Sequence, residues 1–224
     1  MYPIYGPKFP STMSADLHFL VYLLPGITFG FAAAVQPGPL ALYLISQTLR
    51  TGLRKTMPAI FSPLVTDGPI AVLCLFILSK LPLNLIQYIQ LAGGVFILYL
   101  AFRALVAWKN FSETVTIPGP SSRRTFFNAV VVNFLNPGPY LGWSLVIGPL
   151  FLKGWKINPV DGIVLLAGFY LTIIIVMAAM ILLFHLARER GPRLQRALIG
   201  LSSIFLALFG IYQLVTGGLA LWIR

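Results

Sequence analysis

Six long apolar stretches are the feature that most restricts how this chain can fold. They cover residues 17–49, 60–79, 83–108, 126–152, 160–186 and 197–222. Each is long enough for a helix to cross the roughly 30 Å hydrocarbon core of a bilayer, which takes about 20 residues. Strands of a membrane barrel would be about half that length and would alternate in polarity. The sequence therefore predicts an all-α integral membrane protein with six transmembrane helices.

The composition agrees with a membrane protein. Of the 224 residues, 58% are hydrophobic and only 9% are charged, whereas a soluble domain carries about 25% charged residues. The net charge of +11 does not indicate nucleic-acid binding, because the basic residues lie between the apolar stretches, where they orient a membrane protein. Cys74 is the only cysteine, which excludes an intramolecular disulfide and a dithiol redox pair.

A polar linker divides the chain into two halves. The linker covers residues 109–125 and separates a first three-helix unit, 17–108, from a second, 126–224. A polar extension, 1–16, precedes both units and lacks a cleavable signal pattern. Within it, Met13 is an alternative to Met1 as the start of translation.

The two halves resemble each other in two places. "VQPGPLALYLI" aligns with "LNPGPYLGWSL" at an offset of 100 residues, and "LAGGVFILYLAFRALVAW" aligns with "GLSSIFLALFGIYQLVTG" at an offset of 109. Because each half holds three spans, the two repeats must run in opposite directions across the membrane. Inverted repeats of this kind are common in secondary transporters.

The distribution of basic residues predicts the orientation. The loops after the first, third and fifth stretches hold eleven of them, and the other side holds five. The eleven are Arg50, Arg54, Lys55, Arg103, Lys109, Arg123, Arg124, Arg188, Arg190, Arg193 and Arg196. The positive-inside rule places this side in the cytoplasm and both termini outside. Three tryptophans, Trp108, Trp155 and Trp222, lie at the ends of stretches, where an aromatic belt is expected.

A Pro-Gly-Pro preceded by an amide residue interrupts the first apolar stretch of each half. The residues are Gln36, Pro37, Gly38 and Pro39 in the first half and Asn136, Pro137, Gly138 and Pro139 in the second. Proline removes a backbone donor and clashes with the preceding turn, so each motif ends one helix and starts another. We therefore predict that helices 1 and 4 are broken there.

Such breaks predict a substrate-binding site. The backbone groups that a break frees cannot face lipid and must face protein or a water-filled cavity. The start of the new helix also carries partial positive charge, which attracts a carboxylate. Paired breaks in inverted halves point to a transport site near the middle of the bilayer. The alternative is that both are packing kinks.

Asp67 is the only acid in the interior of an apolar stretch, because Asp161 lies at the end of its stretch. A charged aspartate near the bilayer centre costs about 2.5–3.5 kcal/mol on insertion scales. An acid that opens to a cavity can take up and release a proton, so we predict that Asp67 couples protons or captures a substrate ammonium. The alternative is a protonated acid that satisfies a backbone group freed by Pro63 or Pro69. In the second half the corresponding polar candidates are Tyr170 and Thr172.

Three further residues are weaker candidates for substrate binding. Asn133 lies one turn before Asn136, and Tyr140 lies four residues after it, so both can share its helix face. Trp143 is the only tryptophan deep in a stretch. Helix packing accounts for each of them equally well.

Several segments resemble the lysine-exporter (LysE/RhtB) family of bacterial inner-membrane translocators. They are "QPGPLALYLISQTLRTGLRKT", "SPLVTDGP", "LAGGVFILYLAFRAL" and "VVVNFLNPGPYLGWSL", and the resemblance runs from about residue 27 to 213. It implies proton-driven export of amino acids or similar small metabolites from the bacterial inner membrane. Many members carry Gly before the Asp, whereas here Asp67 precedes Gly68 and Pro69. The resemblance therefore implies neither lysine nor homoserine as the substrate.

Other classes of function remain as alternatives. A metal or inorganic-ion exporter needs several converging acids, histidines or thiolates, and Asp67 with Cys74 is a poor set. A thiol-disulfide carrier enzyme needs two cysteines. A non-transporting assembly protein is the remaining alternative. We expect a protein that is not an enzyme, with no cofactor, no bound metal and no nucleic-acid partner. Its partners would be a small substrate, protons and lipid, and a homo-oligomer is left open.

Overall fold

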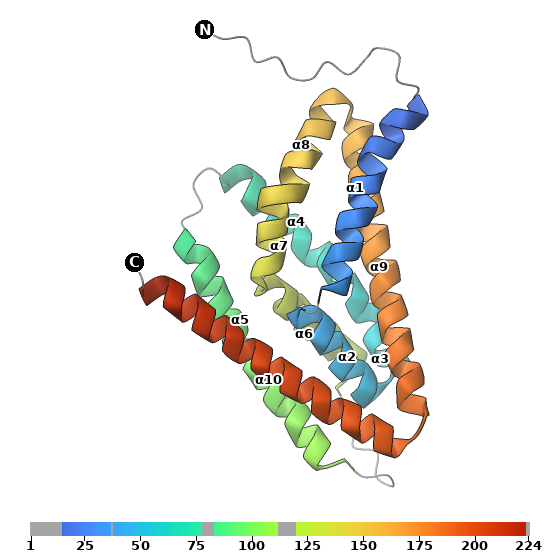
Figure 1. Cartoon of the computed structure of the whole chain (residues 1–224), viewed down its shortest axis with the longest axis vertical. Helices are drawn as coiled ribbons and strands as arrows, with labels where there is room; N and C mark the ends of the chain where they lie inside the picture. Colours follow the sequence, from blue (N-terminus) through green and yellow to red (C-terminus); the bar gives the residue numbers. More distant parts are fainter. Residues whose placement is uncertain (1–14, 37, 78–82, 112–119, 223–224) are drawn as a thin grey trace.

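The computed structural model describes residues 15–36, 38–77, 83–111 and 120–222, which form helices and no strand (Figure 1). In chain order the elements are α1 (Ala15–Val35), α2 (Pro39–Thr51), α3 (Leu53–Thr56), the 3-10 helix η1 (Met57–Phe61), α4 (Ser62–Ile77), α5 (Leu83–Lys109), α6 (Ser122–Phe134), α7 (Pro137–Gly142), the π-helix η2 (Trp143–Ile147), α8 (Gly148–Ile157), α9 (Pro159–Glu189) and α10 (Pro192–Trp222). The prediction of an all-helical protein is confirmed for these residues.

Four helical segments, some of which join consecutive elements, are long and apolar enough to cross a membrane. They are Leu53–Leu75, Gln90–Lys109, Pro159–Glu189 and Pro192–Leu221. A fifth span results if Phe19–Val35 and Pro39–Thr51, which meet at an angle of 59°, are taken together. The predicted fourth stretch, 126–152, is not one such helix, because the chain there is divided among α6, α7, η2 and α8. The structure therefore supports four or five membrane spans.

Helices α1 and α9 pack closely side by side (Figure 1). Glycines allow this approach, because a side chain at Gly26 or Gly30 would collide with the backbone carbonyls of Leu165 or Phe169 on α9. Gly168 of α9 receives α1 in the same way. Small residues at a helix interface let backbones approach in a membrane, where packing rather than the hydrophobic effect holds helices together.

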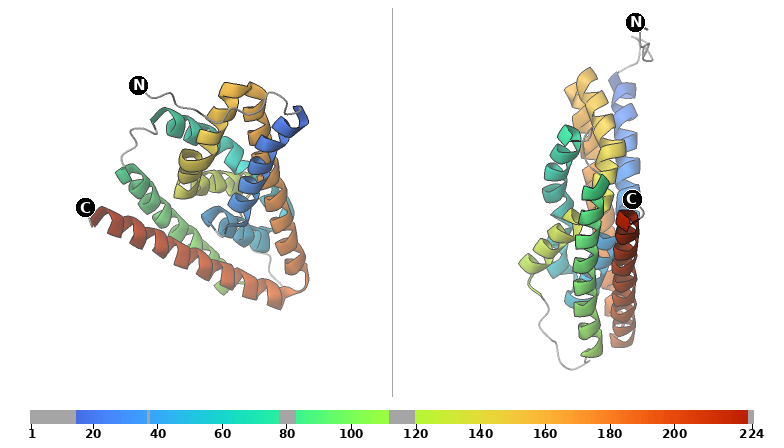
Figure 2. Two further views of the ribbon diagram at one scale, coloured as in Figure 1. Left: turned by 45° about the horizontal axis from the view of Figure 1, so that its top comes forward. Right: turned by 90° about the vertical axis from the view of Figure 1, so that its left-hand side faces the viewer.

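Helices α5 and α10 form a second closely packed pair, which runs side by side in both Figure 1 and Figure 2. Gly94 of α5 and Gly210 of α10 lie where the backbones meet, and a Cβ on either would crowd the other's carbonyl. Gly93 instead faces the carbonyl of Leu135, next to the end of α6. Both α5 glycines therefore permit the close approach of a neighbouring element.

The shorter helices make the core around which these pairs pack. Helix α2 contacts α9, α10 and α6, and α4 lies against α6. The largest group of buried side chains comes from these elements and includes Tyr43 and Leu44 of α2, Cys74 of α4 and Trp143 of η2. The helices that follow the two interruptions therefore supply buried side chains to this core.

Candidate functional site

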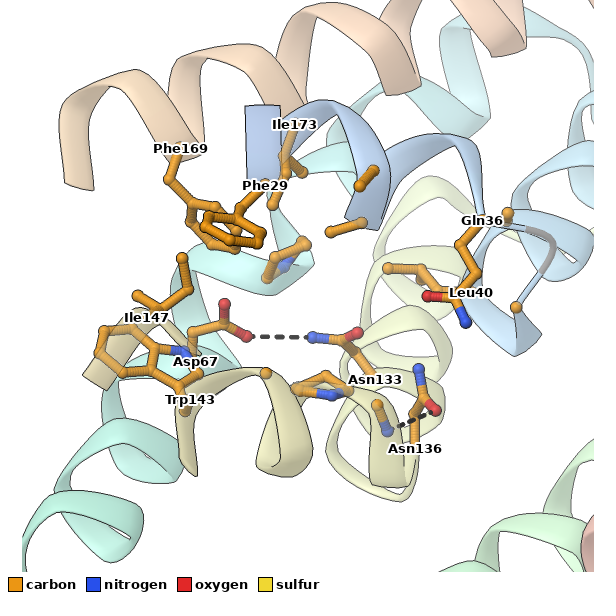
Figure 3. A pocket seen from close by; sticks show the side chains of 18 of the residues that line it. Phe29, Gln36, Leu40, Asp67, Asn133, Asn136, Trp143, Ile147, Phe169 and Ile173 are labelled. Carbon is orange, nitrogen blue, oxygen red and sulfur yellow. Dashed lines mark hydrogen bonds between the residues drawn. The ribbon is translucent and has the colours of Figure 1, made fainter. Parts of the chain in front are cut away.

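The two interruptions predicted by the Pro-Gly-Pro motifs border the same cavity. The backbone leaves α1 at Val35 and enters α2 at Pro39, and it leaves α6 at Phe134 and enters α7 at Pro137. Between them lies a cavity of about 300 Å³ (Figure 3). Among the predicted site residues, its lining includes Gln36, Gly38, Pro39, Asp67, Asn133, Asn136, Gly138 and Pro139.

Three predicted site residues are not among those that line the cavity. Pro37 lies outside the described residues. Pro137 forms the first position of α7 without lining the cavity. The buried Tyr140 donates its hydroxyl hydrogen to the carbonyl of Phe134 at 2.9 Å. That bond satisfies an acceptor left open where α6 ends, so the structure gives Tyr140 a part in closing the break.

Asp67 is the one ionisable side chain in the cavity lining that the structure describes. It lies on α4 and is only 4% exposed. Its Oδ1 accepts hydrogen bonds from Asn133 Nδ2 and from the Thr66 hydroxyl, both at 3.4 Å. Its Oδ2 accepts one from the Tyr170 hydroxyl at 3.3 Å. These contacts are long, and no basic side chain of the lining neutralises the carboxyl.

The alternative of a backbone-satisfying aspartate does not match these contacts. The partners of Asp67 among the described residues are side chains of α4, α6 and α9, and none is a backbone group. The carboxyl therefore joins three helices that come from both halves of the chain. Tyr170, one of the two second-half candidates, is among its partners. The other, Thr172, donates to the carbonyl of Gly168 in its own helix at 2.7 Å.

Asn133 holds α6 against α4. Its Nδ2 donates to the Thr66 hydroxyl oxygen at 2.6 Å, and the Thr66 hydroxyl in turn reaches the carbonyl of Ser62 at 3.1 Å. The second hydrogen of the same nitrogen points to Asp67. The side-chain oxygen Oδ1 of Asn133 has no hydrogen-bond donor among the described residues, so it can serve as an acceptor for a ligand beside the carboxyl.

Trp143 lies next to Asp67 (Figure 3). Its indole nitrogen is buried and faces the Asp67 carboxyl, without reaching the distance and angle of a regular hydrogen bond to any described residue. The residue begins the π-helix Trp143–Ile147, and both ends of this π-helix line the cavity. Single turns of π-helix occur frequently at functional sites. This geometry favours a role in the site over the packing role that the sequence left equally open.

The two helix starts differ in the donors that they offer. In α7, Pro137 and Pro139 have no N–H, and the N–H of Gly138 is taken by the side-chain oxygen of Asn136 at 3.1 Å. The N–H of Asn136 itself bonds to the Asn133 carbonyl. In α2, by contrast, Leu40 and Ala41 both line the cavity and keep N–H groups for which their helix offers no acceptor. The start of α2 also has no side-chain cap, whereas the start of α7 is capped by Asn136. Of the two helix starts, that of α2 is therefore the better suited to an anion.

The apolar part of the cavity lining was missed from the sequence, apart from Trp143. Its large side chains are Phe29, Trp143, Ile147, Phe169, Ile173, Met177 and Phe209. Phe169, Ile173 and Met177 are spaced four residues apart on α9 and share one face. That spacing is the only signal the sequence held, and in an apolar helix it is equally typical of packing.

Three other ionisable residues of α9, His185, Glu189 and Asp161, lie outside the cavity lining. His185 and Glu189 form a pair at 3.3 Å, one helical turn apart, near the end of the helix. Asp161 is buried in its first turn. Within the described residues, no three His, Cys, Asp or Glu side chains gather as a metal site would require.

A family model places the chain among known proteins. The model of the LysE type translocator matches residues 31–217, which include both interruptions, Asp67 and the whole cavity lining except Phe29. The chain belongs to this family. No curated protein and no solved structure matches it. The resemblance seen in the motifs is thus confirmed, and the chain is a multi-pass membrane transporter rather than an enzyme. As a LysE type translocator it exports amino acids or related compounds.

Proposed function

We propose that this LysE type translocator exports a small zwitterionic metabolite, an amino acid or a close analogue, in exchange for protons. The observation that carries the proposal is the placement of one buried carboxyl and one open helix start around a single cavity. A zwitterion needs an acceptor for its ammonium group and donors for its carboxylate. Asp67 and the Asn133 carbonyl supply the acceptors, and the α2 amides supply donors.

The same carboxyl gives a physical basis for coupling. A charged carboxylate inside a membrane is costly unless a cation or a proton accompanies it. Asp67 can hold a substrate ammonium or a proton, but the two compete for the same oxygen atoms. A transporter that exposes this site alternately to each side would carry substrate outward and return with a proton. The proton gradient would then drive export.

We further propose that the chain has six spans arranged as two inverted repeats, 17–108 and 126–224, in the bacterial inner membrane. In this arrangement α6, α7, η2 and α8 together form the fourth span. The proposal is supported by the position of the two interruptions, which correspond in the two halves and border one cavity. Helices broken at the repeat interface commonly form the substrate site of secondary transporters.

This topology places both termini on the periplasmic side. We expect a C-terminal fusion of alkaline phosphatase to be active and the matching fusion of a cytoplasmic fluorescent protein to be dark. Fusions after residue 109, in the proposed cytoplasmic linker, serve as the control with the opposite pattern. A C-terminal fluorescent protein that is bright would contradict the orientation.

Export itself can be tested with purified protein in liposomes. Vesicles loaded with a radiolabelled mixture of amino acids should release or accumulate label only when the protein is present, and an imposed pH gradient should change the final distribution. A protonophore should remove the effect of the gradient. Transport that ignores the gradient would contradict proton coupling, and the absence of any amino-acid movement would contradict the proposed function.

A further inference from the structure

We infer that the substrate is an amino acid with an uncharged, apolar side chain larger than a methyl group. This inference rests on the proposed function and adds the substrate class. It is carried by the division of the cavity into a polar part and an apolar part, by the single charge in its lining, and by its volume.

The cavity has two chemically different sides. In Figure 3, Phe29, Phe169 and Ile173 lie together on one side of the Asp67–Asn133 pair, whereas Gln36 and Asn136 lie toward the other. Asp67 and Asn133 lie between these two groups, and Leu40 of α2 lies near Gln36 (Figure 3). The substituent on the α-carbon of the substrate would project among aromatic rings and aliphatic chains. The residues of α9 that line the cavity are all apolar, namely Phe169, Ile173 and Met177.

The charge of the lining restricts the side chain further. Asp67 is the only ionisable residue among those that line the cavity, and in the proposed complex its charge is matched by the α-ammonium. A second ammonium, as in lysine, would have no carboxylate to pair with, and burying an unpaired charge is strongly unfavourable. A second carboxylate, as in glutamate, would be repelled by Asp67 unless one of the two were protonated. The cavity therefore disfavours substrates with a cationic or an anionic side chain relative to substrates with an uncharged one.

The volume sets a lower limit on the size of the substrate. A cavity of about 300 Å³ has room for about ten water molecules at roughly 30 Å³ each, so the smallest amino acids would leave part of it unfilled. Alanine would leave the apolar side unfilled and forgo contact with Ile173 and Met177. Because methionine side chains adapt easily to shape, Met177 allows several side chains of similar volume to fit.

A matched pair of ligands tests the inference on the wild-type protein. L-norleucine and L-lysine have the same straight chain and differ in a terminal methyl group or ammonium group. We expect norleucine to bind the protein in nanodiscs at least about tenfold more tightly than lysine and at least about tenfold more tightly than L-alanine. Binding would be measured by calorimetry, and export of the same three compounds would be measured from loaded liposomes.

A pair of variants tests where the side chain lies. Ile173 lines the cavity and is 4% exposed, whereas Ile175 on the same helix is 65% exposed. We expect Ile173→Ala to reduce the preference for norleucine over alanine severalfold, because it removes apolar contact on the proposed side. Ile175→Ala should leave that preference unchanged.

Each outcome bears on a separate claim. Lysine or alanine that binds and is exported as well as norleucine would overturn the inference and leave the proposed function standing. An unchanged preference in a folded Ile173→Ala variant would overturn the placement of the side chain on α9. Failure of all three compounds to bind or move, together with failure of the wider amino-acid mixture, would overturn the proposed function. The ligand comparison uses wild-type protein, so it stands even if Ile173→Ala does not fold.

Discussion

The Asp67→Asn variant is expected to fold and insert normally but to lose export driven by a pH gradient by at least about 30-fold. Asparagine has nearly the same shape as aspartate, and its one side-chain oxygen can still accept a hydrogen bond from either Asn133 or Tyr170, which reach different oxygens of the carboxyl. Its amide cannot bind and release a proton in the physiological range. If Asp67 pairs with a buried ammonium, the loss corresponds to roughly 2–5 kcal/mol.

Binding measured beside transport separates the two roles of this carboxyl. If Asp67 serves only as the proton carrier, the variant should still bind norleucine, because the α2 amides and the apolar side of the cavity are unchanged. If Asp67 also holds the substrate ammonium, binding should weaken together with transport. The proposed exchange of ammonium for proton at one carboxyl predicts the second result.

Asp161→Asn is the matched control. Asp161 is also buried, at 5% exposure, but it belongs to the first turn of α9 and does not line the cavity. We expect this variant to retain gradient-driven export once corrected for the amount of folded protein. Normal gradient-driven export by Asp67→Asn would remove this residue from the mechanism and leave it a structural link between helices.

Filling the cavity from Gly142 should abolish binding and export. Gly142 ends α7 and lines the cavity, and a Cβ added there meets no heavy atom within 4 Å. A phenylalanine at this position can therefore enter the space without displacing backbone. Glycine is about 1 kcal/mol less favourable than alanine inside a helix and also ranks below phenylalanine. We therefore expect that replacing Gly142 by phenylalanine does not weaken the helix. We expect Gly142→Phe to reduce norleucine binding by about 100-fold or more, measured by calorimetry on protein that elutes as the wild type does.

Gly218→Phe controls for the effect of adding a ring to the molecule. Gly218 lies in α10, has equally open surroundings and does not line the cavity. Its variant should bind and transport as the wild type. Wild-type binding by Gly142→Phe would show that the cavity between the two interruptions is not the substrate site.

The helical fold could be predicted well because apolar length is a direct demand of the bilayer. The fifth stretch, predicted as 160–186, is α9, Pro159–Glu189. The fourth stretch was predicted less well. Apolar composition indicates that a segment is surrounded by lipid or protein, but it does not indicate whether the segment is one continuous helix. In this stretch the helix is interrupted between Phe134 and Pro137.

The polar part of the site could be predicted for a related reason. A carboxyl or amide within an apolar stretch is costly, so Asp67, Asn133 and Asn136 stood out in the sequence. The apolar part of the lining did not stand out. Ile173 and its neighbours are of the same residue types as side chains that face lipid or pack against other helices. The difference between the two helix starts was readable in principle. Asparagine followed by proline, glycine and proline predicts a capped helix start with no free donor.

The unequal helix starts have an evolutionary consequence. Both groups that would recognise the charges of a zwitterion, Asp67 and the α2 amides, belong to the first half of the chain. Most of the large apolar side chains of the cavity belong to the second, on η2, α9 and α10. Mutations in the second half can thus change which side chain is accepted while recognition of the shared backbone part is kept. After gene duplication, copies with this arrangement can change their substrate. They need not first lose proton coupling or the binding of the shared backbone part of an amino acid.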